Sequence, residues 1–289
     1  MIQKSLLLRL ITEVLSVSAM WISDIREQRR MCFQTLILWQ SGKITAIIGS
    51  TGCGKSTLVN LIPRFYDVTG GSIELDGHDI RDYTLSELRE SIGFVPQKGI
   101  LFSGTIASNL RFGKADASDE QIKKAADIAQ ASEFIETKND RYDSSIAQGG
   151  SNVSGGQKQR LAIARAIAKD PHIYVFDDSF SALDMKTDAR LRAALAEVTE
   201  NASVIIVAQR ISTIIHADQI LVLDDGKIVG KGTHEELLKN CDVYMQIAQS
   251  QLSAKELGLD DKVAETATDK AADTATKNSN RYFGCIRLR

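Results

Sequence analysis

Neither an excess of charge nor a set of paired cysteines marks this sequence. It carries 35 Lys and Arg residues against 37 Asp and Glu residues, so its formal net charge is −2 at pH 7. Without a broad positive field, a nucleic-acid partner is not expected. The four cysteines (Cys32, Cys53, Cys241 and Cys285) form no C-x-x-C pair. A metal centre or a disulfide framework is therefore not indicated, and a reducing compartment such as the cytosol fits the sequence better.

A long apolar run is also absent from the sequence. The best candidate, residues 6–19, is short and is interrupted by Arg9 and Glu13. A helix that crosses a bilayer needs about 20 predominantly apolar residues. We therefore expect any membrane role to come through a partner.

Residues 49–57 are the most informative segment that is present. They match the pattern G-x-x-x-x-G-K-[ST] and lie between an apolar run at 44–48, typical of a buried strand, and a helix-like run at 58–62. A phosphate-binding loop requires this context, because its glycines let backbone N–H groups point at a phosphate and the helix start adds partial positive charge. The predicted nucleotide-binding residues are Gly49, Ser50, Thr51, Gly52, Cys53, Gly54, Lys55, Ser56 and Thr57.

Three of these residues have separate predicted roles. Lys55 would neutralise the β- and γ-phosphates of a nucleotide, and the hydroxyl of Ser56 would bind Mg²⁺. Cys53 stands where the pattern accepts any residue, so we interpret it as a small filler without a redox role.

Between residues 41 and 251, apolar strands alternate with capped helices. Capping boxes begin at Thr84, Ser118 and Thr233. Such alternation predicts an α/β fold with a mostly parallel sheet. Residues 99–154 lack strong strands and predict a helical insertion, and the polar composition past residue 252 predicts a disordered tail. The expected strands are residues 92–95, 172–176, 203–207, 219–223 and 227–229.

A second marker is the apolar strand that ends in Asp177 and Asp178. If this strand lies beside the phosphate-loop strand, Asp177 can hold Mg²⁺ directly or through water. Asp178 then stands where a carboxylate that activates water belongs. Together with the phosphate loop upstream, the pair predicts a nucleotide-hydrolysing site.

A third marker makes the sequence resemble a known family. Residues Ser154, Gly155, Gly156 and Gln157 open a predicted helix and resemble the signature of ATP-binding-cassette (ABC) transporter ATPases, which usually begins with Leu where this chain has Val153. In that family the serine hydroxyl and the glycine amides clamp the γ-phosphate of ATP held by a second cassette. The resemblance implies a P-loop NTPase fold with a parallel core sheet, a helical subdomain at about residues 99–160 and an antiparallel β edge layer.

Further positions extend the resemblance. Gln97 resembles the Q-loop glutamine, which contacts Mg²⁺ and the attacking water and whose loop touches the membrane domain. Residues 181–184 resemble the D-loop, and residues 101–106 and 148–150 resemble exporter-type cassettes. The resemblance therefore implies ATP and Mg²⁺ as cofactors and multidrug or lipid export at the cytoplasmic face of the cell membrane. The implied partners are the transmembrane domain of an exporter and a second cassette.

Two positions depart from the family pattern. Asp178 stands at the position of the catalytic glutamate, and Gln209 replaces the switch histidine. Aspartate is one methylene shorter than glutamate, and a displacement near 1 Å can cost ~10²-fold in rate. Glutamine carries no titratable proton. We therefore predict the slow site of a heterodimeric exporter, whose intact signature completes the partner's site.

Other interpretations of the chain stay open. A homodimer could tolerate both substitutions, and the chain could be a nucleotide-binding regulatory subunit that does not hydrolyse ATP, or an inactive gene fragment. A soluble ABC ATPase of DNA repair or translation is less favoured. Such proteins usually carry a long coiled-coil insertion or a second cassette, and neither is visible in the sequence.

Residues 1–40 do not follow the family pattern. The family has two strands and an adenine-stacking aromatic residue ahead of the phosphate loop, whereas Trp21 and Trp39 lack the expected context and residues 26–33 show no strand or helix period. The edge layer is therefore expected to be incomplete. Read one base out of frame, codons for residues 20–40 can encode a family-like segment with the missing tyrosine. We thus predict a frameshift near codon 40, a membrane domain further upstream, and a division into residues 1–40, 41–251 (the ATP-binding domain) and 252–289.

Overall fold

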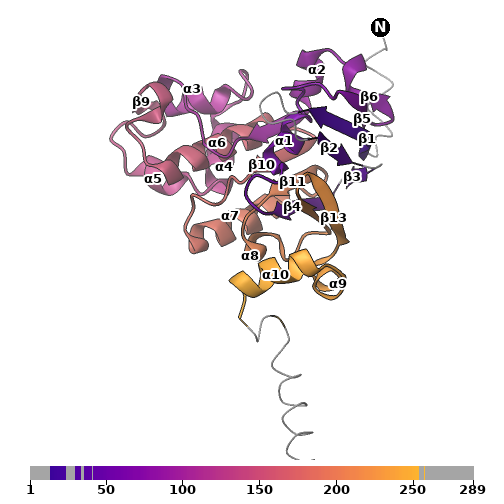
Figure 1. Ribbon diagram of the computed structural model, residues 1–289. Coiled ribbons are helices and arrows are strands. Elements are labelled where there is room, and N and C mark those ends of the chain that lie inside the picture. The colour runs from indigo at the N-terminus through magenta and orange to yellow at the C-terminus, as the bar shows by residue number, and fades with distance from the viewer. Residues whose placement is uncertain (1–13, 24–29, 34–35, 41, 254–256, 258–289) are drawn as a thin grey trace, which may run out of the picture.

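The computed structural model describes residues 14–23, 30–33, 36–40, 42–253 and 257. The disordered tail predicted past residue 252 therefore lies almost entirely outside the described residues. Of the first three strands, only the backbone is described. Two large sheets, a small two-stranded sheet and a group of helices make up the described structure (Figure 1).

The central layer is a sheet in the order β13-β12-β4-β11-β10-β7, six strands among the residues described. The neighbours from β12 to β7 run parallel, and β13 pairs antiparallel with β12 at one edge. This arrangement confirms the predicted parallel α/β core. The strands are β4 (Ile44–Gly49), β7 (Ile92–Val95), β10 (Ile173–Asp177), β11 (Ser203–Val207), β12 (Gln219–Asp224) and β13 (Lys227–Gly232).

The inner strands of this sheet are buried on both faces. In β11, Val204 and Ile206 belong to one apolar cluster, whereas Ile205 and Val207 belong to the cluster on the opposite face. A strand covered on both faces reads as a continuous apolar run rather than as an alternating one. The apolar runs of the sequence could therefore be recognised as strands before their neighbours were known.

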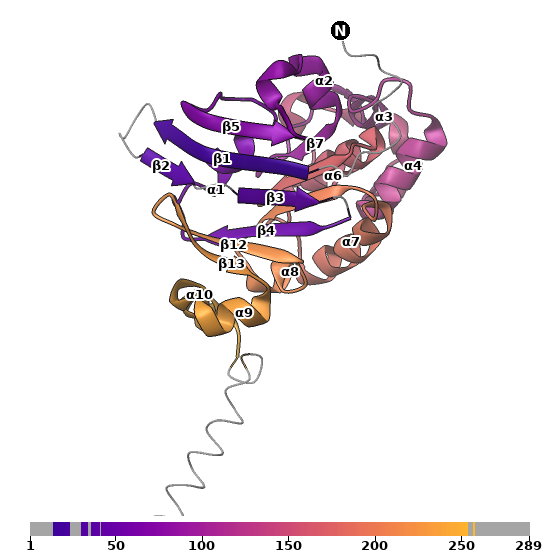
Figure 2. The ribbon, with the colours of Figure 1, turned by 90° about the vertical axis from the view of Figure 1, so that its right-hand side faces the viewer.

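A second, antiparallel sheet packs beside the central one (Figure 2). It is built on β1, which pairs with β2, β3 and β5. Residues 26–33 show no strand period in the sequence, yet β2 occupies part of this stretch. Antiparallel pairing uses backbone hydrogen bonds, which do not require a periodic side-chain pattern. The strands are β1 (Val14–Ser23), β2 (Arg30–Phe33), β3 (Leu36–Gln40), β5 (Gly70–Leu75) and β6 (His78–Asp79).

The helical insertion forms a separate part of the molecule, on the left in Figure 1. Its longest helix, α6, packs against α3 and α4. Capping boxes at Thr105, Ser118 and Ser154 start α3, α4 and α6, as the sequence predicted for Ser118. The elements are β8 (Gly104–Thr105), α3 (Ile106–Arg111), α4 (Asp119–Ile128), α5 (Ser132–Glu136), the 3₁₀ turns Arg141–Asp143 and Gln148–Gly150, β9 (Ser145–Ile146) and α6 (Gly155–Lys169).

The remaining helices cover the sheets. The predicted capping boxes at Thr84 and Thr233 are present at the starts of α2 and α9. Within the described part of the chain, no helix combines the length and apolarity needed to cross a membrane. These helices are α1 (Lys55–Asn60), the 3₁₀ turn Ile80–Asp82, α2 (Leu85–Glu90), α7 (Met185–Val198), α8 (Ile211–Ile214), α9 (His234–Asn240) and α10 (Asp242–Gln251).

Candidate nucleotide-binding site

The phosphate loop joins β4 to α1, as the sequence predicted. At its start, a Cβ on Gly49 would lie 2.0 Å from the carbonyl oxygen of Leu223, so only glycine fits. At its end, Gly54 caps α1 with a φ of 102°, in the left-handed region that favours glycine. Both ends of the loop therefore need the glycines that the motif supplies.

Lys55 places its ammonium group over this loop. Its Nζ donates to the carbonyl oxygens of Gly49 and Ser50, each at 2.8 Å, and lies 3.7 Å from Cys53 Sγ. A cation held against a turn of backbone amides makes a site suited to phosphate. The side chain of Cys53 is only 4% exposed and belongs to an apolar cluster, which agrees with its interpretation as a filler.

The two predicted magnesium ligands of the loop and the strand lie next to each other. Ser56 Oγ donates to Asp177 Oδ1 at 3.0 Å, although 121 residues separate them in the chain. Burial raises the pKa of the Asp177 carboxyl, and the hydrogen bond from Ser56 and the charge of Lys55 oppose that rise. A buried carboxylate beside a hydroxyl is an oxygen donor set of the kind that Mg²⁺ prefers, so these residues fit the implied ion.

Asp178 has different partners from its neighbour. Its Oδ2 accepts from Gln97 Nε2 at 2.9 Å and from Gln209 Nε2 at 2.6 Å. Its backbone has a φ of 47°, and its N–H donates to Val207 at 3.0 Å. The three predicted catalytic residues therefore meet, because each follows a strand of the same parallel sheet and the carboxyl ends of such strands lie at one edge. In this arrangement Gln97 contacts Asp178 rather than Asp177.

One residue that holds the site together was not predicted. Gln159, on α6, is only 2% exposed. Its Nε2 donates to the Pro96 carbonyl at 3.0 Å, and its Oε1 accepts from Gly99 N–H at 2.8 Å. The carboxamide thus spans the loop that carries Gln97. A polar residue at a buried helix position is the one sequence signal that could have singled it out.

The signature residues form the start of α6. The hydroxyl of Ser154 accepts from Gln157 N–H at 3.2 Å, while Gln157 Oε1 accepts from Ser154 N–H at 3.0 Å. Ser154 and Gly155 are exposed, and a Cβ on Gly155 would meet no atom within 4 Å. The amino end of a 15-residue helix is therefore open to a ligand from outside this chain.

A comparison with protein-family models shows which family has this arrangement. The model described as ABC transporter matches residues 36–181, a span that contains the phosphate loop, the signature and both aspartates. This chain belongs to the ABC transporter family. Its fold is accordingly the ABC cassette, and the resemblance inferred from the motifs is confirmed.

Relatives of this ABC transporter chain agree with the assignment. It is 51% identical over 220 residues to an ABC transporter ATP-binding protein of Mycobacterium tuberculosis H37Rv, covering 75% of this chain and 38% of the relative. It is 46% identical over 219 residues to ATP-binding cassette sub-family B member 6 of Xenopus tropicalis, covering 76% and 26%. A Staphylococcus aureus protein, whose name suggests multidrug export and combines ATP-binding and permease parts, is 44% identical over 212 residues, with 73% and 37% covered.

A solved structure is similar as well. A bacterial Atm1-family ABC exporter with ATP bound matches with a TM-score of 0.79 and 35% sequence identity, covering 84% of this chain and 43% of that one. The chain thus spans less than half of each of these proteins.

Proposed function

We propose that this chain is the ATP-binding and ATP-hydrolysing part of an exporter-type ABC transporter. Its own phosphate-loop site turns over slowly, and its signature completes the site of a second, different cassette. The observation that carries the proposal is the meeting of Asp178 with Gln97 and Gln209 beside the Ser56–Asp177 pair. That arrangement keeps every part of a nucleotide site but alters the group that acts on water.

The residues of the site divide between binding and chemistry. Lys55 and the loop amides bind the phosphates, and Ser56 and Asp177 are the residues that would hold Mg²⁺. Gln97, the third predicted magnesium ligand, is bonded to Asp178. When bound, Mg²⁺ supplies positive charge that neutralises the phosphates. Asp178 orients and polarises the water, but its short side chain already accepts two amide donors on one oxygen. With two donors on one oxygen, this carboxylate has fewer lone pairs left to accept a hydrogen bond from the water.

Gln209 is the second residue that slows turnover at this site. Its amide can donate a hydrogen bond to a γ-phosphate, as a neutral histidine could, but it cannot become a cation. In the structure that amide is already bonded to Asp178. We infer that both departures act on the same step, because they contact each other.

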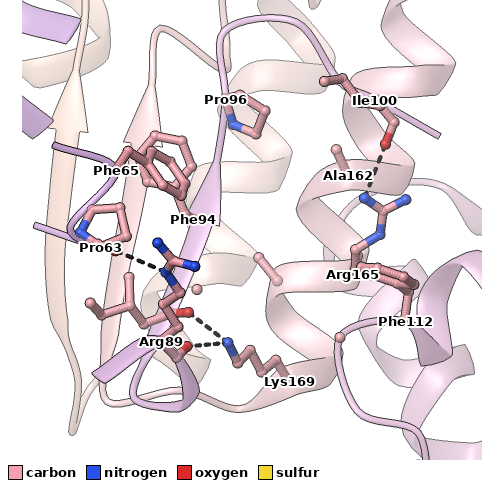
Figure 3. Close-up of a pocket in the computed structure, with 14 residues that line it drawn as sticks. Pro63, Phe65, Arg89, Phe94, Pro96, Ile100, Phe112, Ala162, Arg165 and Lys169 are labelled. Carbon is pink, nitrogen blue, oxygen red and sulfur yellow. Dashed lines mark hydrogen bonds between the residues drawn. The ribbon is translucent and has the colours of Figure 1, made fainter. Parts of the chain in front are cut away.

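A groove beside the Q-loop provides the surface for the membrane partner. It has a volume of about 250 Å³ and lies between the sheet, at Phe94 and Pro96, and the helical part, at Ile100 and Phe112 (Figure 3). Ile100 is 58% exposed and Phe112 is 65% exposed. Pro96, the residue directly before Gln97, lines the groove, so a segment seated in it could transmit motion to the site.

The charge of this groove indicates what it binds. Its cationic lining residues are Arg89, Arg165 and Lys169, and none of the described residues that line it is acidic. Burial lowers the pKa of Arg165 to about 10, which leaves the guanidinium charged at neutral pH. The occupant that fits is a short segment of the membrane-spanning part with an apolar face and a carboxylate.

The proposal predicts that restoring the family residues accelerates the site. In the assembled transporter, Asp178→Glu combined with Gln209→His should raise ATP turnover at this site by about tenfold or more, because the carboxylate would move closer to the water. Steady-state ATP hydrolysis of the variant and of the wild type measures the change. Asp242→Glu with Gln246→His, on the exposed face of α10, makes the same chemical changes away from the site.

Each outcome of this experiment has a definite meaning. A rise in the site variant alone supports the proposal, and unchanged turnover refutes the explanation for slow hydrolysis. MgATP binding without turnover in any variant would instead favour a non-hydrolysing regulatory subunit. A chain that is folded but binds no MgATP would overturn the nucleotide site itself.

A further inference from the structure

The last residue of α10 contacts the loop that carries Gln209. Gln251 Oε1 accepts from the backbone N–H of Ile211 at 2.9 Å, and its Nε2 donates to the backbone carbonyl of Gln209 at 2.8 Å. Forty or more residues separate these groups in the chain. A helix outside the nucleotide site therefore holds the backbone of a residue inside it.

The two hydrogen bonds act on one short stretch of backbone. They lie on either side of Arg210, which has an extended conformation and gives α8 no side-chain cap. A carboxamide that bonds an N–H and a C=O two residues apart pairs with the loop as a neighbouring strand would. Gln251 thereby satisfies the first amide of α8 and fixes the orientation of Gln209.

The helix that carries Gln251 is itself firmly placed. Tyr244 and Ala248 of α10 are fully buried. The hydroxyl of Tyr244 lies 2.7 Å from Nδ1 of His234 in α9. A side chain that projects from a packed helix positions its partner more accurately than one from a loop.

We propose that Gln251 is a positioning residue that keeps the Gln209 amide directed at Asp178 and at the γ-phosphate of bound ATP. The inference rests on the proposed function, because it assumes that Gln209 reaches that phosphate. Gln159 holds the Gln97 loop in the same manner. Each of the two glutamines on Asp178 is thus held by a second glutamine from a different helix.

A purely structural role for Gln251 makes a different prediction. If Gln251 only caps α8, its removal would lower the stability of the chain and weaken the binding of every nucleotide by the same factor. If Gln251 acts through Gln209, its removal would weaken the binding only of nucleotides that have a γ-phosphate. The ratio of two affinities therefore separates the two roles.

The experiment measures this ratio on the full-length chain. Calorimetry gives the Kd of MgADP and of a magnesium-bound ATP analogue with a non-hydrolysable β–γ bond. In Gln251→Ala, the preference for the analogue should fall by about fivefold, the effect of one net hydrogen bond, while the Kd of MgADP stays unchanged. In Gln251→Glu, the preference for the analogue should fall by at least as much, since a carboxylate cannot donate to the Gln209 carbonyl. Gln249→Ala, an exposed glutamine of the same helix, is the matched control.

A double-mutant cycle tests whether the effect passes through Gln209. If it does, adding Gln251→Ala to Gln209→Ala causes no further loss of the preference. An additive loss, an equal loss for both nucleotides, or a wild-type preference in Gln251→Ala would overturn the inference. A wild type that binds both nucleotides without preferring the analogue would overturn it as well. A wild type that binds neither nucleotide would overturn the proposed function, and this inference with it.

Discussion

Two adjacent carboxylates at the end of β10 have different surroundings. Asp177 accepts from a hydroxyl, and burial raises its pKa, whereas Asp178 accepts from two amides. Different surroundings are how neighbouring acids take separate roles in a site. The structure thus supports the division between a metal ligand and a group that acts on water, which the order of the residues alone only suggested.

The surroundings of His234 predict how the stability of the fold depends on pH. Burial lowers the pKa of His234 from its usual 6.5, the nearby His216 adds to this effect and Glu235 opposes it. The buried phenol of Tyr244 keeps its proton, because burial raises its pKa, so it can donate to neutral Nδ1. Protonation of the imidazole removes that acceptor.

Acid should therefore destabilise the fold through His234. The folded chain binds this proton more weakly than the unfolded chain does, so stability is lost as pH falls below the unfolded pKa. Between about pH 7.5 and about pH 5.5 the thermal midpoint of the wild type should fall more than that of His234→Gln. Thermal unfolding followed by circular dichroism measures both. The exposed His78→Gln should behave as the wild type, and equal slopes for all three chains would contradict the prediction.

At the scale of elements, α6 combines two contributions to function. Its first turn carries the signature, and Gln159 two residues further on holds the Q-loop. In the proposed assembly, the helix joins the phosphate-loop part of the chain to the surface that would face a second cassette. A change at its cap, Ser154, should therefore alter both the stability of this chain and the ATP turnover of the assembled transporter.

Ser154→Ala separates these effects. Losing the capping hydroxyl should lower the free energy of unfolding by about 1 kcal/mol. If the signature completes the partner's site, ATP turnover of the assembled transporter should also fall by about 10²-fold or more, the typical effect of removing a polar group that stabilises a transition state. Chemical denaturation and steady-state hydrolysis measure the two quantities.

Ser118→Ala is the matched control for this prediction. Ser118 caps α4 with the same type of capping box. Its loss should cost similar stability and leave turnover unchanged. Equal turnover in both variants would show that Ser154 acts only as a cap.

At the scale of the whole molecule, the groove beside the Q-loop is the proposed link between the nucleotide site and the membrane-spanning part. Ile100→Asp places a carboxylate on its exposed apolar rim. Association with the membrane-spanning part should weaken by about tenfold or more, because a charge replaces an apolar contact residue, while MgATP binding by the chain should remain. Co-purification and transport in reconstituted vesicles measure the first effect, and calorimetry measures the second.

Val229→Asp is the comparison for this variant. Val229 is also exposed, at 44%, but lies on β13, outside the residues that line the groove. A similar loss of association in both variants would assign the effect to surface charge in general. The frameshift near codon 40 stays a prediction at this scale, because β1–β3 show how the backbone pairs and not how the gene is read.

The sequence by itself determined the features that depend on neighbouring residues. The phosphate loop, the capping boxes and the signature are each set by a few consecutive residues. The buried strands are indicated by apolar runs. The family and the core of the fold could therefore be predicted.

Only the tertiary structure decided which distant residues meet. The bonds from Gln97 and Gln209 to Asp178 cross 81 and 31 residues, and those of Gln159 and Gln251 depend on where two helices end up. The strand β2 and the cationic groove were likewise invisible in the sequence. Backbone pairing needs no side-chain pattern, and contacts between loops follow from the order of strands in the sheet, which no single stretch of the chain encodes.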